Sequence, residues 1–241
     1  IERSRSFVAV NIDGDLPGAQ KLGARFKVSG YPTMVLMNPE GTEITRLPGE
    51  VDAPQVMQVL QLGLAGGRPV KAVLADARAG KPLAGNEWRM LAFYSWDTDE
   101  SQLMPPAERP GVLAQLSRAC PPAEADSATR LMLKALAESD DAKGVKPDNA
   151  LRERVRGWLA DAALARRQMD VVVNYAPELT KALTPDGGAP RKAMAASFET
   201  ALRRLEADST LSRGDRLSAL LARVELARID LPKNERHPKI A

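Results

Sequence analysis

Side chains able to do covalent or metal chemistry are scarce in this chain of 241 residues. Its one cysteine, Cys120, cannot form an internal disulfide, and its one histidine, His237, excludes metal sites and acid–base pairs built on several histidines. Cys120 precedes two prolines at the end of an expected helix. A small buried hydrophobic side chain is the main interpretation there, and a reactive or resolving thiol is the alternative. We predict no catalytic residue, no metal site and no cofactor within these residues.

Three carboxylates stand within four positions, at Asp97, Asp99 and Glu100. A calcium site is one interpretation, but the segment lacks the glycine and the ligand spacing of an EF-hand loop. We therefore expect a solvated cap or turn.

Four of the ten aromatic residues lie within nine positions, at Trp88, Phe93, Tyr94 and Trp96. One interpretation is a hydrophobic plug where a helical region meets an α/β region. The other is an exposed patch that binds unfolded or partner polypeptides. The sequence favours the plug.

The dipeptide Tyr31-Pro32 is the most informative feature of the chain. It lies in the segment Val28-Ser29-Gly30-Tyr31-Pro32-Thr33 and is followed by four apolar residues. A proline at the start of a buried strand cannot donate a ladder hydrogen bond, so its presence there needs a structural reason. Only before proline is a cis peptide bond cheap, about 0.5–1 kcal/mol above trans. A cis bond is therefore one interpretation of Pro32, and an ordinary proline at the start of a strand is the alternative.

The elements that position this dipeptide form an α/β order. They are expected as a strand (7–12), a helix (17–26), two strands joined by a turn (33–38 and 42–47) and a helix that Asp52 caps and that ends near Leu64. Leu22 and Phe26 lie four residues apart, which places them on one face of the first helix.

This ordered series resembles the second half of a thioredoxin domain. The resemblance rests on Val10-Asn11-Ile12-Asp13, Gly30-Tyr31-Pro32-Thr33, Pro39-Glu40-Gly41 and Gly49. It implies that Gly30, Tyr31, Pro32 and Thr33 bind substrate, because in the family the residue before the cis-proline pairs its backbone with an extended peptide. The partners that it implies are protein thiols or disulfides, or extended polypeptide segments.

The family's Cys-x-x-Cys motif is missing from the chain. The resemblance places the first strand, the first long helix and the two cysteines before residue 7, where only residues 1–6 stand. That strand lies between the strands matching 7–12 and 33–38, so without it both strands would have unpaired edges. We expect an N-terminal segment outside these residues, lost by proteolysis, truncation or omission.

The rest of the chain changes character after residue 66. Residues 67–85 are expected to be a linker or a weak helix, and residues 86–241 an all-helical bundle or array. The last expected helix has its apolar stripe at Leu217, Leu220, Leu221, Val224 and Leu226. The predicted fold is thus an incomplete thioredoxin-like domain (1–66) followed by an all-α domain.

The composition limits the classes of partner that we expect. The net charge is +3, and basic and acidic residues are mixed, so we expect no nucleic acid and no anionic membrane as a partner. No apolar run approaches the roughly 20 residues that span a bilayer.

Three functions remain open from the sequence. The first is a thiol–disulfide oxidoreductase of a bacterial periplasm, or alternatively of the cytoplasm, whose cysteines lie outside these residues and whose helical domain docks the partner. The second is a redox-inactive binding or chaperone module. The third is an assembly protein in which the helices are the functional part.

Overall fold

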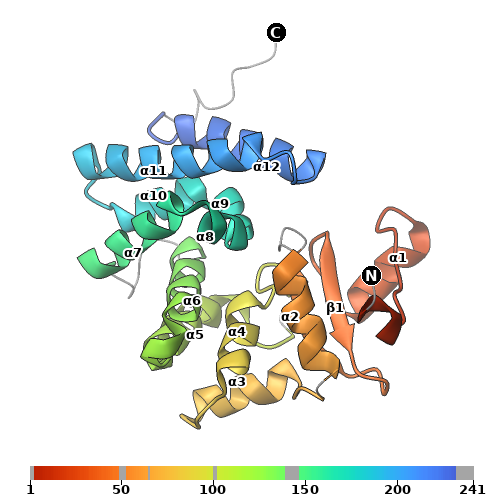
Figure 1. The fold of residues 1–241 in the computed structure, drawn as a ribbon. Coiled ribbons are helices and arrows are strands. Elements are labelled where there is room, and N and C mark those ends of the chain that lie inside the picture. The colour runs from red at the N-terminus through yellow and green to blue at the C-terminus, as the bar shows by residue number, and fades with distance from the viewer. Residues whose placement is uncertain (1–2, 49–52, 65, 100–101, 139–146, 232–241) are drawn as a thin grey trace. The chain divides into compact units, whose positions relative to one another are not determined.

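The computed structural model describes residues 3–48, 53–64, 66–99, 102–138 and 147–231 (Figure 1). The chain forms two compact units, one of Ile1–Arg109 with Arg118–Ala128 and one of Pro110–Ser117 with Thr129–Ala241. Among the described helices, none is both long enough and apolar enough to cross a membrane.

The first unit begins with a small α/β region (Figure 1). Its elements are the 3-10 helix η1 (Arg3–Ser6), helix α1 (Pro17–Arg25), strands β1 (Thr33–Met37) and β2 (Glu43–Pro48), and helix α2 (Ala53–Leu64). The two strands are antiparallel, with Thr33 opposite Pro48 and Leu36 opposite Thr45. The expected cap Asp52 and the expected Gly49 lie outside the described residues.

The turn between the strands is fixed by its own side chains and backbone. The Asn38 carboxamide oxygen accepts a hydrogen bond from the Thr42 N–H at 2.7 Å, and the Asn38 N–H donates to the Thr42 carbonyl at 2.9 Å. Gly41 has a φ of +77°, a conformation that is cheap only without a Cβ. The predicted hairpin is confirmed.

Residues 7–12 do not form the predicted strand. They are irregular, and Val8, Val10 and Ile12 are 92%, 75% and 43% exposed. A β-strand is stabilised by its ladder hydrogen bonds, and among the described residues these six have no strand partner. The alternation of apolar residues indicated a segment able to form a strand, but a strand also needs a neighbouring strand to bond with.

Two further helices of the first unit contact the sheet. They are α3 (Val70–Arg78) and α4 (Gly85–Phe93), and both contact β2, as α2 does. Residues 67–85, expected to be a linker or a weak helix, thus include α3, which buries Val73 and Leu74. Short 3-10 helices follow at Pro106–Glu108 (η2) and Pro122–Glu124 (η3).

The expected domain boundaries at residues 66 and 86 stay a prediction, because compact packing does not define the limits of a domain.

The aromatic cluster is buried. Trp88 and Phe93 are 5% and 6% exposed, and Tyr94 and Trp96 are fully buried. The Trp96 indole donates to the Leu91 carbonyl at 3.0 Å, and its ring lies edge-on to Tyr94 at 4.7 Å between centroids. These residues form core, and the alternative of an exposed patch is wrong.

The second unit is helical. It contains most of α5 (Arg109–Ala119) and α6 (Ala125–Ala137), and then α7 (Asn149–Ala160), α8 (Ala162–Arg167), α9 (Met169–Asn174), α10 (Ala176–Leu183), α11 (Gly188–Ala207) and α12 (Arg213–Ala227). Helix α11 contacts α7, α8, α9, α10 and α12, so it is the centre of this unit. The side chains of Asp148, Asp161 and Ser212 cap helices α7, α8 and α12.

Helix α12 does not bury its predicted stripe. Leu226 is buried, but Leu217 and Leu221 are 53% and 57% exposed. The helix instead turns Ala219, Ala222 and Leu226 inward. Small alanines allow close helix approach, which leucine periodicity alone does not reveal.

The second unit contains a cluster whose charged side chains, those of Arg130, Lys134 and Asp170, are buried. Arg130 makes two hydrogen bonds to the Asp170 carboxylate, at 2.9 and 2.5 Å, and one to the Gln168 side chain at 2.7 Å. The Lys134 ammonium is 3.8 Å from Asp170 and 4.7 Å from the centroid of the Tyr175 ring. We call these five residues the Arg130 cluster.

Candidate functional site

The loop between α1 and β1, together with the first residue of β1, holds the four residues that the sequence singles out. We call residues 30–33 the proline loop. The Tyr31–Pro32 peptide bond is cis, and the Thr33 hydroxyl donates to the Gly30 carbonyl at 2.7 Å. Tyr31 is 60% exposed, and within the described chain neither its N–H nor its C=O has a hydrogen-bond partner. The loop therefore offers a free backbone donor and acceptor beside an exposed ring.

Two glycines make room for the Tyr31 ring. A Cβ on Gly23 would lie 2.7 Å from the Tyr31 hydroxyl oxygen, and one on Gly14 would lie 3.2 Å from a ring carbon. The ring thus rests on the end of α1 and on the turn before it. This support fixes one face of the ring.

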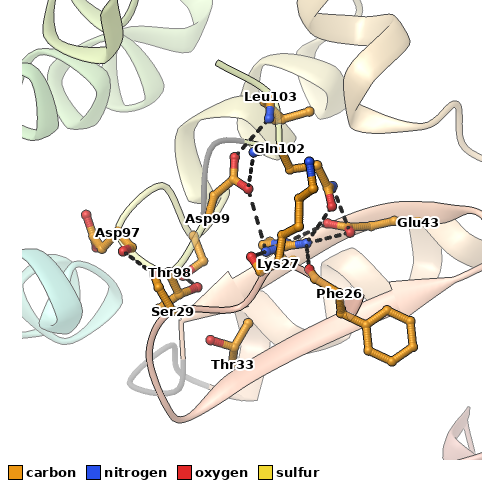
Figure 2. A network of polar contacts seen from close by, with 12 residues as sticks. Phe26, Lys27, Ser29, Thr33, Glu43, Asp97, Thr98, Asp99, Gln102 and Leu103 are labelled. Atoms are coloured by element: carbon orange, nitrogen blue, oxygen red, sulfur yellow. Dashed lines mark hydrogen bonds and ion pairs between the residues drawn. The ribbon is translucent and has the colours of Figure 1, made fainter. Parts of the chain in front are cut away.

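On the other side of the loop lies a segment distant in sequence. Val28 forms an isolated antiparallel bridge with Asp99, and the Ser29 N–H donates to the Thr98 carbonyl at 3.0 Å. The Ser29 hydroxyl donates to the Asp97 carbonyl at 3.5 Å (Figure 2). We call residues 97–99 the flanking segment. It pairs with residues 28 and 29 but not with Tyr31.

Arg46 connects the two sides of this site. It projects from β2, is fully buried, and donates to the carbonyls of Phe26 and Lys27 at 2.8 and 2.9 Å. It also donates twice to the Glu43 carboxylate, each time at 2.7 Å. Lys27 has a φ of +50°, so Arg46 holds the carbonyl of a residue in a left-handed conformation.

The same guanidinium reaches the last residue of the flanking segment and a residue beyond it. It donates to the Gln102 side-chain oxygen at 3.1 Å and lies 3.7 Å from the Asp99 carboxylate. The Gln102 amide in turn donates to Glu43 at 3.0 Å, so these groups form one network around Arg46 (Figure 2). We call Arg46, Glu43, Asp99 and Gln102 the Arg46 network.

Burial and charge act in opposite directions on Arg46. Burial lowers the pKa of Arg46, but the hydrogen bond to Glu43 and the charges of Glu43 and Asp99 raise it by more, so the net pKa of Arg46 is raised. The Tyr94 phenol nearby has its pKa raised, mainly by burial. Arg46 therefore stays charged, and Tyr94 stays neutral, at physiological pH.

The turn that the sequence predicts in the acidic segment is present at residues 97 and 98, but Asp99 is buried and not solvated. Asp99 is 3% exposed and accepts hydrogen bonds from the N–H groups of Gln102 and Leu103, at 3.1 and 3.2 Å. Glu100 lies outside the described residues. Within the described residues, no group of three or more His, Cys, Asp or Glu side chains could hold a metal ion.

Cys120 lies away from the proline loop in the sequence and is half-buried. Burial, helped by the charge of Glu124, raises the pKa of its thiol from 9.0 to about 11. Its Sγ lies 3.5 Å from the Glu124 carbonyl. A thiol with a raised pKa is a poor nucleophile at neutral pH.

A family model described as a thioredoxin-like domain matches residues 2–63. This region belongs to the thioredoxin superfamily. No curated protein and no solved structure in the comparisons matches the chain. The thioredoxin-like region includes the proline loop and Arg46, whereas the flanking segment and Gln102 lie beyond it. The structure brings these parts together within the first unit.

Sequence reasoning found the proline loop but missed the residues that surround it. Arg46 is a charged residue in an otherwise mostly apolar strand, which is a signal that it needs buried partners. Thr98 and Gln102 carried no such signal. That residues 30–33 bind a substrate stays a prediction.

Proposed function

We propose that the proline loop binds extended polypeptide segments. The free N–H and C=O of Tyr31 would pair with the backbone of the incoming segment, which adds a short strand at this point. The recognition is mainly of backbone, so it accepts many sequences. The exposed ring of Tyr31 supplies apolar contact that a pair of hydrogen bonds alone would lack.

The observation that carries this proposal is the state of Tyr31. Tyr31 is 60% exposed, lies against two glycines and has no backbone partner among the described residues, so it is preorganised for contact. Preorganisation favours binding because less conformational entropy is lost when the partner arrives.

The experiment is a titration of the protein into fluorescein-labelled extended peptides, followed by fluorescence anisotropy. We expect Tyr31→Ala to weaken binding about tenfold, which corresponds to about 1.4 kcal/mol of binding free energy. Tyr31→Phe should weaken binding less than about threefold, because the ring is kept. Leu221→Ala is the matched control, because Leu221 is exposed to a similar degree in the second unit. Equal losses in Tyr31→Ala and Leu221→Ala would contradict the proposal.

A second function, thiol–disulfide exchange, has its own support. Among the described residues β1 pairs only with β2, and Val8, Val10 and Ile12 are exposed in an irregular segment. A strand placed between them, as in the thioredoxin order, would bury these side chains. We propose that such a strand, with a helix bearing two cysteines, belongs to a segment outside these 241 residues.

In that activity a thiolate attacks a partner disulfide and forms a mixed disulfide, releasing one partner thiolate. The second thiolate then attacks the mixed disulfide, so the protein's dithiol is oxidised as the partner's disulfide is reduced. Together with this activity we propose a bacterial periplasmic location, which cell fractionation would check.

Two experiments test the exchange activity: reading the gene sequence upstream of Ile1, and an insulin-reduction assay with dithiothreitol. Reduction by the 241-residue chain alone, unchanged in Cys120→Ser, would contradict this placement of the thiols.

A further inference from the structure

The proline loop is flanked by residues that the thioredoxin-like match does not include. The match ends at residue 63, yet Val28 and Ser29 pair with Asp99 and Thr98. A Cβ on Gly30 would lie 3.1 Å from the methyl carbon of Thr98. The Thr98 side chain therefore lies directly beside the residue that precedes the exposed Tyr31.

Arg46 is placed to hold this flanking segment against the loop. A guanidinium has five N–H donors in one rigid plane, so a single side chain can bond several partners at once. On one side Arg46 bonds the carbonyls of residues 26 and 27, which lead into the loop. On the other side it contacts Asp99 and Gln102, which end and follow the flanking segment.

We propose that the flanking segment is one wall of the docking site, with Thr98 as a specificity-determining residue and Arg46 as a positioning residue. This rests on the proposed docking function. A strand added at Tyr31 passes Thr98, which is half-exposed and whose methyl group lies where a Cβ on Gly30 would meet it. The wall limits the size of the partner side chain at that point, so the preferred partner is an extended polypeptide with a small residue there.

The positioning role is tested by hydrogen exchange of individual amides, which needs no bound peptide. We expect Arg46→Met to speed exchange of the Ser29 amide, which donates to Thr98, about tenfold or more, since local opening controls its exchange. Gln102→Ala removes one contact of Arg46 and should speed it about threefold. The Trp88 amide in α4 is the internal control and should not change. An unchanged exchange rate of the Ser29 amide in both variants would overturn the positioning role of Arg46. If Arg46→Met does not fold, the exchange rate in Gln102→Ala alone tests this role.

The specificity role is tested with eight-residue peptides of alternating threonine and valine, with one central position varied among glycine, alanine, valine and phenylalanine. We expect the chain to bind the glycine peptide about fivefold more tightly than the phenylalanine peptide, a modest steric discrimination. Thr98→Ala should abolish this preference by raising the affinity for the phenylalanine peptide, and the isosteric Thr98→Val should keep it. An unchanged preference in Thr98→Ala would contradict the proposal that the flanking segment is a wall of the docking site. Absence of binding to every peptide would contradict the docking function itself, while the exchange experiment still decides the role of Arg46.

Discussion

The two units each bury an arginine completely, but they use it differently. The central ion pair of the Arg130 cluster joins two helices, with Arg130 on α6 and Asp170 on α9. The Arg46 network joins a strand to irregular backbone, since Arg46 bonds two loop carbonyls and the Glu43 side chain, which is 13% exposed. The first arrangement is closed within a core, and the second lies beside an exposed loop.

This difference indicates what each arginine controls. Removal of Arg130 leaves the Asp170 carboxylate buried without its main partner, so the whole unit is destabilised. Removal of Arg46 frees carbonyls close to an exposed loop, where water can replace part of the lost bonds. We therefore expect a large global effect at Arg130 and a smaller, local effect at Arg46.

The largest effect is expected for Arg130→Met. The free energy of unfolding should fall by about 3–5 kcal/mol, because a buried carboxylate loses its charge partner. The measurement is urea denaturation of the wild type and the variant. Arg156→Gln is the control, because it breaks the solvent-exposed pair with Glu153 and should cost less than about 1 kcal/mol. A loss no larger than that of the control would show that the Arg130 cluster does not stabilise the unit.

Arg46→Met should cost less, about 2–3 kcal/mol, in line with hydrogen bonds to a charged group. We also expect Arg46→Met to weaken peptide binding. Arg130→Met, in the second unit, should leave peptide binding unchanged at temperatures where both variants are folded. Denaturation and anisotropy on both variants make the comparison. If the two variants lost peptide affinity equally, the distinction between the two arginines would be wrong.

The Arg130 cluster should also be sensitive to acid. Burial raises the pKa of Asp170, but Arg130 and Lys134 lower it more, so the folded pKa lies below the ordinary 3.8. A depressed folded pKa means that the stabilisation is complete at neutral pH and is lost as the pH falls below about 4. The free energy of unfolding, measured from pH 7 to 3, should fall less steeply in Asp170→Asn than in the wild type. Parallel curves would contradict the assignment.

A smaller effect is expected from Gly23→Ala, whose Cβ would lie 2.7 Å from the Tyr31 hydroxyl oxygen and so displace the ring. We expect peptide affinity to fall about threefold with a stability change below about 1 kcal/mol, since only a flexible side chain must move. Gly18→Ala in the same helix has no atom within 4 Å and is the control. It should leave affinity unchanged and stabilise the helix by about 0.5–1 kcal/mol. Equal affinities in the two variants would mean that the ring's support is irrelevant to binding.

The smallest effect is expected at Cys120. With a thiol pKa of about 11 in place of 9.0, its thiolate fraction at pH 8 is about a hundredfold lower than for an unperturbed thiol. Alkylation by iodoacetamide should therefore be much slower in the folded protein than in urea, as mass spectrometry would report. Cys120→Ser should leave peptide binding unchanged. Rapid alkylation of the folded protein would restore the reactive-thiol interpretation.

Sequence patterns predicted the elements whose cause is local. The hairpin follows from the turn residues Asn38 and Gly41, and α1 and α2 from apolar spacing. The patterns failed where long-range packing decides. Residues 7–12 alternate as a strand does but have no described strand partner, and α12 buries alanines instead of its leucine stripe. The proline loop was predictable from Tyr31-Pro32, but its wall was not, because residues 28 and 99 are joined only by the fold.

The most direct test of docking at the proline loop is the exchange rate of the Tyr31 amide with and without a saturating extended peptide. This amide has no partner within the described chain, so we expect it to exchange fast in the free protein and at least about tenfold more slowly in the complex. An unchanged Tyr31 rate in a peptide-saturated sample, with protection at other amides instead, would contradict docking at the proline loop.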